Sequence, residues 1–295
     1  YLGESKPWGN VGEMSNRGIE LDMNYRYSIG DFNFSIGANA TYIKTILINA
    51  GNETGILDGG SFHQMGTITR GQNGMVYPYF YGYKTDGVFQ NWDEVNSYVG
   101  ADGSLIQPSA QPGDFRYQDL DGDGKITAEG DRTNLGKCVP AWTYGVNASI
   151  DWKGIDFSMV WQGVAGNKIF DGTRRTDIPT MNQPKYVLNR WTGEGSTNAY
   201  PRFTTTDPNQ NWSKASDFFI KDASYFRLKN ITLGYTLPYN WTKKVFVKKL
   251  RVYVAAENLL TLTKYDGFDP EIAGYMDRGI YPQARTFQFG ASITF

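Results

Sequence analysis

A run of alternating aspartates is the strongest candidate for chemistry in this sequence. Asp119, Asp121 and Asp123 are separated by single residues, and Gly124 follows them and permits a sharp turn. Ca²⁺ prefers six to eight oxygen ligands, and alternate carboxylates on a tight loop supply several of them. The carbonyl of Lys125 can supply another. The spacing therefore predicts a Ca²⁺ loop, with Mg²⁺ as the second choice and a turn without an ion as the alternative.

The far end of this loop departs from the usual pattern. The twelfth position, which normally carries a bidentate Glu, falls on Gly130. Glu129, one residue earlier, or Asp131, one residue later, must supply that ligand. We expect the ion to brace a long loop and not to perform catalysis. The predicted ligands are Asp119, Asp121, Asp123, Lys125, Glu129 and Asp131.

The other reactive side chains form no catalytic pattern. The chain has one histidine and one cysteine, which excludes paired histidines, disulfides within the chain and multi-cysteine metal sites. Nothing near His63 suggests an oriented carboxylate and nucleophile. Glu4, Glu13 and Glu20 have no spacing that supports glycoside hydrolysis. We expect Cys138 to be a small packed residue and the protein to be no enzyme.

Aromatic residues are the candidates for substrate contact. A ladder of alternate tyrosines begins at Tyr77, and two tryptophans lie in the polar segment 166–222. Aromatic rings stack on sugar rings or on apolar peptide side chains. The ladder could equally be a membrane-facing or interfacial girdle. The candidate substrate-binding residues are Tyr79, Tyr81, Tyr83, Trp191 and Trp212.

Composition narrows the class of protein. The formal net charge is -1, which argues against a nucleic-acid partner because such proteins usually carry a basic face. Aromatic residues make up 15% of the chain, and this richness is typical of β proteins. We find no apolar run long enough for a transmembrane helix. The sequence opens at Tyr1 in the middle of a pattern, so we expect a piece of a longer chain.

Long strands must position these residues, because apolar and polar side chains alternate along seven segments. Such segments are longer than the five to six residues of an ordinary strand. They fit the roughly 9–11 residues with which a tilted strand crosses a bilayer. The segments are 19–29, 31–43, 141–152, 154–163, 224–237, 250–262 (the least regular) and 287–295.

The connections between these segments are of two kinds. Tight turns occur at 28–31 and 152–154, whereas the other end has long polar loops. Outer-membrane barrels combine short periplasmic turns with long outer loops. This asymmetry favours an antiparallel transmembrane β-barrel over a soluble β-sandwich. The predicted outer loops are 45–76, 90–140, 166–222 and 263–283, the turn 238–249 is predicted to be periplasmic, and a short helix is predicted at 182–191.

The number of strands bears on whether the barrel can close. Segment 45–140 must begin and end on the outer side of the membrane. It therefore holds either no membrane strand or an even number of them. We favour two strands, around 62–70 and 77–89 with a turn at Gly71–Gly74, which gives nine; the alternative is seven. Both counts are odd, whereas single-chain bacterial barrels have even counts. We therefore expect this chain to complete a larger barrel.

Five stretches of the sequence carry a family resemblance. They are PYFYGYKTDGVFQNWDEV (78–95), GDFRYQDLDGDGKIT (113–127), SDFFIKDASYFRLKNITLGYTLP (216–238), LRVYVAAENLLTLTKYDGFDPEI (250–272) and YPQARTFQFGASITF (281–295). Together they resemble the C-terminal part of the SusC/RagA family, the TonB-dependent outer-membrane transporters of Bacteroidetes-type bacteria. The resemblance follows the chain in order and covers nearly all of it.

This resemblance implies a 22-stranded barrel in the bacterial outer membrane, surrounded by lipid and holding a plug domain. A SusD-like surface lipoprotein would form the lid, nutrient oligomers (glycan or peptide) would be the substrate, and TonB would supply energy. Residues 1–295 would be the last part of the barrel, with 90–140 and 166–222 as extracellular loops, while the plug and the TonB contact lie outside this sequence. Two such complexes could pair.

Two other functions stay open. One is a surface adhesin or Ca²⁺-dependent sugar-binding β-protein, whose apolar face would form a dry core. The other is an outer-membrane lipase, which would need a Ser–His pair at the lipid boundary.

Overall fold

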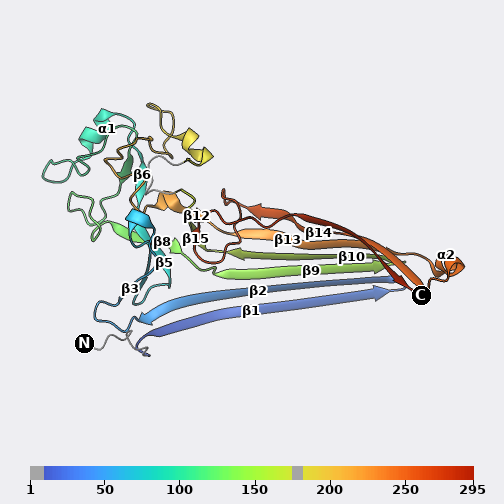
Figure 1. The fold of residues 1–295 in the computed structure, drawn as a ribbon. Helices are drawn as coiled ribbons and strands as arrows, with labels where there is room; N and C mark the ends of the chain where they lie inside the picture. Colours follow the sequence, from blue (N-terminus) through green and yellow to red (C-terminus); the bar gives the residue numbers. More distant parts are fainter. Residues whose placement is uncertain (1–9, 175–181) are drawn as a thin grey trace, which may run out of the picture.

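Long antiparallel strands form one open sheet, and shorter elements gather beyond one end of it (Figure 1). The computed structural model describes residues 10–174 and 182–295. Each strand of the sheet pairs with the long strand that precedes or follows it in the sequence. Across the sheet, the order is β1 (Glu13–Ile29), β2 (Phe32–Asn49), β9 (Trp142–Trp152), β10 (Ile155–Ala165), β13 (Tyr225–Thr236), β14 (Lys249–Thr263) and β16 (Thr286–Thr294).

All seven alternating segments are strands of this sheet, so that prediction is confirmed. The tight turns are confirmed as well: two residues join β1 to β2, and two join β9 to β10. In the second of these turns, Lys153 has φ 46° and Gly154 has φ 87°. Positive φ at both positions matches the right-handed twist of the flanking strands.

The preference for nine membrane strands is wrong. β4 (Thr69–Gln72) and β5 (Tyr79–Tyr83) pair with each other, but they lie in a separate four-stranded sheet. All five residues of β5 are buried, whereas a membrane strand needs one polar and one apolar face. Within the described residues the large sheet has seven strands, which was the alternative count.

Short elements fill the long loops. The four-stranded sheet is β3 (Ile56–Asp58), β4, β5 and β8 (Arg132–Lys137); a second small sheet is β12 (Ile220–Asp222), β11 (Lys168–Asp171) and β15 (Met276–Asp277); β6 (Thr85–Val88) pairs with β7 (Phe115–Tyr117). The helices are α1 (Trp92–Ser97) and α2 (Tyr239–Thr242), with 3₁₀ turns η1 (His63–Met65), η2 (Lys185–Asn189), η3 (Asp217–Phe219) and η4 (Lys243–Val245).

The helix expected at 182–191 is shorter than predicted. It is the 3₁₀ turn η2, which begins directly after Pro184. The sequence reading missed α1, whose first turn is capped by the Asn91 side chain accepting a hydrogen bond from the Glu94 amide at 3.0 Å. No helix among the described residues is long and apolar enough to cross a membrane.

The largest cluster of buried apolar side chains lies beyond the end of the sheet. Three loops contribute to it, so the loops pack into one folded unit. We call residues 50–141, 166–174, 182–224 and 264–285 the loop assembly. Its main core is Phe62, Met65, Ile68, Phe80, Cys138, Phe170, Val187, Trp212, Ala215 and Phe219.

Candidate functional site

The sheet has one apolar face and one polar face, and strand register keeps each face uniform across all seven strands. One row of apolar partners is Tyr25, Ile36, Ala148, Met159, Ile231, Ala256 and Phe287, and the next is Tyr27, Phe34, Ile150, Phe157, Leu233, Val254 and Phe289. Between them, on the other face, lie Arg26, Ser35, Ser149, Ser158, Thr232, Ala255 and Gln288.

Large side chains of the apolar face are exposed. Ile19 is 73% exposed, Leu233 49% and Phe289 82%. A soluble sandwich would cover such a face with a second layer, and in the described residues that cover does not exist. Contiguous apolar surface of this kind marks an interface with lipid or with another protein.

The polar face carries its own contacts. The Arg251 guanidinium forms an ion pair with Asp156 and donates from Nε to Oδ1 at 2.8 Å. The hydroxyls of Ser35 and Ser149 lie 2.8 Å apart on neighbouring strands. These contacts keep charged and polar groups together on the side of the sheet that faces away from the apolar rows.

A cavity of about 490 Å³ opens where the pairing of β2 changes partner. The Ile43 amide still donates to Ala141 next to β9, whereas the Leu47 amide donates to Met75 in the loop assembly. Polar, apolar and cationic groups line the opening together, and its size suits a small-molecule group. Its walls include Asn16, Ile43, Thr45, Tyr77, Lys137 and Val139.

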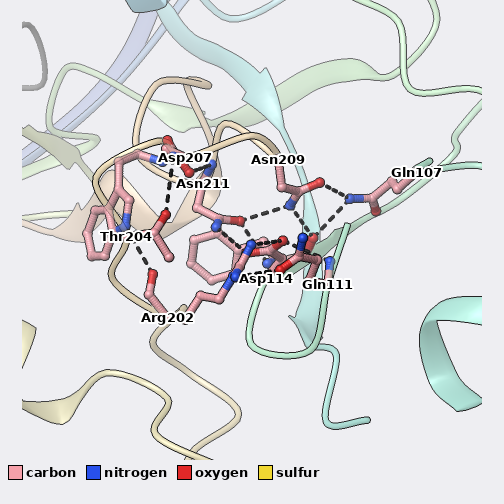
Figure 2. Close-up of polar contacts among 10 residues, drawn as sticks. Gln107, Gln111, Asp114, Arg202, Thr204, Asp207, Asn209 and Asn211 are labelled. Atoms are coloured by element: carbon pink, nitrogen blue, oxygen red, sulfur yellow. Dashed lines mark hydrogen bonds and ion pairs between the residues drawn. The ribbon is translucent and has the colours of Figure 1, made fainter. Parts of the chain in front are cut away.

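Inside the loop assembly, a buried polar network joins two loops. Figure 2 shows a continuous chain of hydrogen bonds from Gln107 through Asn209 and Asn211 to Asp114, at 2.9, 2.8 and 2.8 Å. Arg202 completes it with an ion pair to Asp114, from Nε to Oδ1 at 2.6 Å and from Nη2 to Oδ2 at 3.1 Å. The Asp114 carboxylate is fully buried, so this pairing compensates a charge that has no water around it.

A second ion-pair network fixes the last loop to the sheet. Arg227 on β13 contacts Asp269 at 2.5 Å and Glu271 at 2.7 Å, and Lys229 also contacts Glu271 at 2.7 Å. The side chains of Arg227 and Asp269 are each 4% exposed. Burial alone would raise the pKa of Asp269, but hydrogen bonds from Arg227 and from the amides of Gln283 and Glu271 outweigh it and lower that pKa.

The structure brings together three of the predicted metal ligands. The carboxylates of Asp119, Asp121 and Asp123 have oxygen atoms within 4.8 Å of one another. Asp119 also accepts the Gly122 amide at 2.7 Å and the Gly124 amide at 2.9 Å, which closes the tight turn. The arrangement can hold a hard cation if backbone carbonyls and water complete the shell.

The other predicted ligands, Asp131, Glu129 and Lys125, are placed differently from these three aspartates. Asp131 is fully buried and accepts the amides of Leu120 and Thr127, both at 2.6 Å, so its carboxylate braces the two ends of the loop. Glu129 is exposed and, like Asp131, lies outside the group of three carboxylates. The Lys125 amide donates to Asp123 at 2.9 Å, and a ligand role for the Lys125 carbonyl stays a prediction.

The candidate aromatic residues lie mostly in the interior. Tyr79, Tyr81, Tyr83 and Trp212 are 2%, 8%, 9% and 3% exposed. The ladder is therefore neither an open stacking surface nor a membrane girdle, because β5 is an inner strand of the loop assembly. Trp191 is half-buried, with its indole N–H donating to the Gln90 side chain at 3.3 Å. A substrate role for these five residues stays a prediction.

The single cysteine and the single histidine of the chain both lie in the loop assembly. Cys138 is 4% exposed within the main core, and burial raises the pKa of its thiol to about 12. A neutral, buried thiol fits the packed role expected of it. His63 stands in η1 with its ring 4.3 Å from that of Phe62.

Sequence reasoning missed both ion-pair networks. Arg202 is 88 residues from Asp114, and Arg227 is 42 residues from Asp269. No local pattern marks such partners, since charged residues are frequent along the loops. The only hint was Asp269-Pro270-Glu271, part of a stretch that carried the family resemblance.

The chain is similar in sequence to TonB-dependent receptors. No family model matches it. It is 30% identical over 314 residues to TonB-dependent receptor P3 of Formosa agariphila, a match that covers 100% of this chain and 30% of the relative. It is 26% identical over 299 residues to TonB-dependent receptor SusC of Bacteroides thetaiotaomicron, covering 97% of this chain and 27% of the relative.

Solved structures agree on the fold. The structure of the RagAB peptide transporter matches with a TM-score of 0.74 at 22% identity, covering 97% of this chain and 29% of that one. The RagAB peptide importer in its open-open state matches with a TM-score of 0.72 at 23% identity. The chain thus spans about 30% of the length of the curated relatives. In sequence and in fold, the chain is similar to part of a TonB-dependent receptor of the SusC/RagA kind.

Proposed function

We propose that the chain forms wall and outer loops of an outer-membrane importer of nutrient oligomers, either glycans or peptides. In this proposal the apolar face contacts lipid, the polar face lines the lumen and the loop assembly stands outside the cell. A SusD-like lipoprotein would cover the loop assembly, and TonB would act through residues outside this chain. The named relatives are receptors and importers, which supports a transport function without catalysis.

The two-faced sheet is the observation that carries the proposal. Aromatic residues stand near both ends of the apolar face: Tyr42 and Trp142, whose ring centroids are 5.0 Å apart, at one end, and Phe32 and Trp152 at the other. Ten residues of β2 separate the two levels. A strand tilted by about 40° rises roughly 25 Å over that length, which is the height of the apolar band of outer-membrane barrels.

The test uses the full-length receptor in its own cell. Deletion of its gene should abolish growth on one class of oligomer as sole nutrient, glycan or peptide, and leave growth on monomers unchanged. Purification in mild detergent should give a protein of roughly three times the 33.2 kDa of this chain, as its 30% share of the relative implies. A lipoprotein should co-purify with it. Unchanged growth on every oligomer, or solubility without detergent, would contradict the proposal.

The adhesin or sugar-binding alternative makes a different prediction about the apolar face. It requires a soluble fold in which Leu233 and its neighbours are covered by protein. The exposure of this face across all seven strands favours lipid contact instead. Extraction decides between the two functions, because an adhesin domain of this kind would be released from membranes by alkaline carbonate and a barrel wall would not.

We also propose that the aspartate loop binds Ca²⁺ and thereby braces the outer loops. Three carboxylates so close together repel one another, and a divalent cation removes that repulsion. An Asp121→Ala variant of the receptor should lose Ca²⁺-dependent protection of 113–135 from proteolysis and leave the sheet intact. Glu53→Ala, which removes an exposed carboxylate elsewhere, is the matched control. Identical cleavage of 113–135 with Ca²⁺ and with a chelator in the parent protein would refute the site.

A further inference from the structure

The connection between β13 and β14 is unlike the other turns at its end of the sheet. The turns before β2 and β10 each use two residues, whereas residues 237–248 form twelve residues of connection with two short helical turns, α2 and η4. Figure 1 shows α2 beyond the end of the sheet that lies opposite the loop assembly, next to the C-terminus. We call residues 237–248 the helical turn.

The helical turn is folded, yet it presents large apolar side chains to its surroundings. Thr242 and Val247 are buried, and the Val247 amide donates to the Thr242 carbonyl at 3.2 Å. Phe246 adopts φ 60°, a left-handed conformation that bulky residues avoid, and its side chain is 90% exposed. Tyr239, Trp241 and Val245 are also exposed, at 61%, 62% and 65%. An ordered apolar patch of this kind marks a contact surface.

All charged residues of the helical turn are basic. Lys243, Lys244 and Lys248 are exposed, and residues 237–248 contain no Asp or Glu. Within the part of the chain that the structure describes, none of these three lysines forms an ion pair. A partner must therefore be apolar and anionic at once.

The position of the helical turn identifies this partner. The Leu237 amide donates to Leu250, and Leu250 is paired with Ile293, so the apolar face of the sheet runs up to the turn. Lys248 precedes Leu250 by two residues and therefore shares the side of β14 that bears the apolar face. Lysine at the edge of an apolar band, with aromatic rings beside it, is the arrangement of a membrane–water interface.

We propose that the helical turn binds the anionic phospholipid headgroups of the leaflet at the tight-turn end of the wall. Trp241, Tyr239 and Phe246 enter the headgroup layer, and the lysine ammonium groups bind lipid phosphates. An acidic periplasmic protein would match the charge but not the continuity with the apolar face. The inference rests on the proposed function, because it requires the apolar face to contact lipid.

The experiment measures membrane depth in the full-length receptor, reconstituted in vesicles of phosphatidylethanolamine with phosphatidylglycerol. Nitroxide labels are attached, one at a time, to F246C, L233C and N96C, which report on the helical turn, the middle of the apolar face and the loop assembly. The label at 246 should lie at headgroup depth, between the immersed label at 233 and the aqueous label at 96.

A charge variant tests the headgroup contact. K243Q/K244Q/K248Q should bind phosphatidylglycerol on the order of a hundredfold more weakly, since each lysine near an anionic surface contributes about a factor of five. The control K84Q/K185Q/K264Q removes three exposed lysines of the loop assembly and should leave phosphatidylglycerol binding unchanged. An aqueous label at 246 beside an immersed label at 233, or equal lipid binding by both triple variants, would overturn this inference alone. An aqueous label at 233 would overturn the proposed function itself.

Discussion

Arg202→Gln is expected to reduce the free energy of unfolding of the loop assembly by about 3–5 kcal/mol, as happens when one partner of a buried ion pair is removed. The Asp114 carboxylate is fully buried, and Arg202 holds both of its oxygens. In the variant, Asn211 and the Gln111 amide still donate to Asp114, but no positive charge compensates it. The carboxylate must then be protonated or reach water, and either event loosens the network of Figure 2.

Hydrogen exchange on the full-length protein measures this loss. Amides in 107–117 and 207–212 should exchange faster in Arg202→Gln, while those of β9 and β10 keep their protection. Arg116→Gln is the matched control, because Arg116 pairs with Asp86 at the surface, where the two side chains are 33% and 60% exposed. Such a pair contributes about 1 kcal/mol or less. Equal exchange in the two variants would show that the buried pair does not stabilise the loop assembly.

Arg227→Gln is expected to release the last loop, residues 264–285, from the sheet. The change leaves Asp269 buried without a cation and removes one of the two cations that bind Glu271. We expect the free energy of local unfolding of this loop to fall by about 3–5 kcal/mol. Rapid exchange confined to 264–285 is the expected result. Lys221→Gln provides the control, because its contact with Asp266 in the same loop is 3.9 Å long and the two side chains are 23% and 59% exposed.

The same loop should respond to acid in a defined direction. The pKa of Asp269 is lower in the folded protein than in an unfolded chain, so the folded loop favours the charged carboxylate. Its contribution to stability is therefore present above the ordinary Asp pKa of about 3.9 and is lost as the pH falls below it. The protection factors of the amides in 264–285, which correct for the intrinsic pH dependence of exchange, should fall only in that acidic window. Release of the loop near neutral pH would contradict the assignment.

The sequence predicted the sheet well because membrane-type strands carry a simple, local signal. Alternation along 19–29 or 141–152 depends on each residue and its immediate neighbours, and turns such as Lys153-Gly154 have a recognisable chemistry. The segment 77–89 misled the same reasoning, because a buried strand such as β5 is also rich in tyrosine. Period alone does not distinguish a ring facing lipid from a ring in a protein core.

The site was only partly predictable, for a related reason. The three aspartates at 119, 121 and 123 are close in space because they are close in sequence, and the structure does bring them together. Asp114 and Arg202 meet only because two loops pack on a shared core, so their contact depends on the whole arrangement. Burial of Tyr79 and Trp212 depends on the same packing. Local spacing does not encode contacts of this kind.

The route of the long loops bears on how proteins with this fold can diversify. β10 ends at Ala165, next to the start of β13, because Val164 pairs with Tyr225. The loop between these two strands therefore leaves and re-enters the sheet across about 4.8 Å, so recombination could exchange it without moving a strand. Yet Phe80, from the loop between β2 and β9, shares one core with Phe170 and Trp212, from the loop between β10 and β13. We expect new specificities to be inherited as a set of loops and not loop by loop.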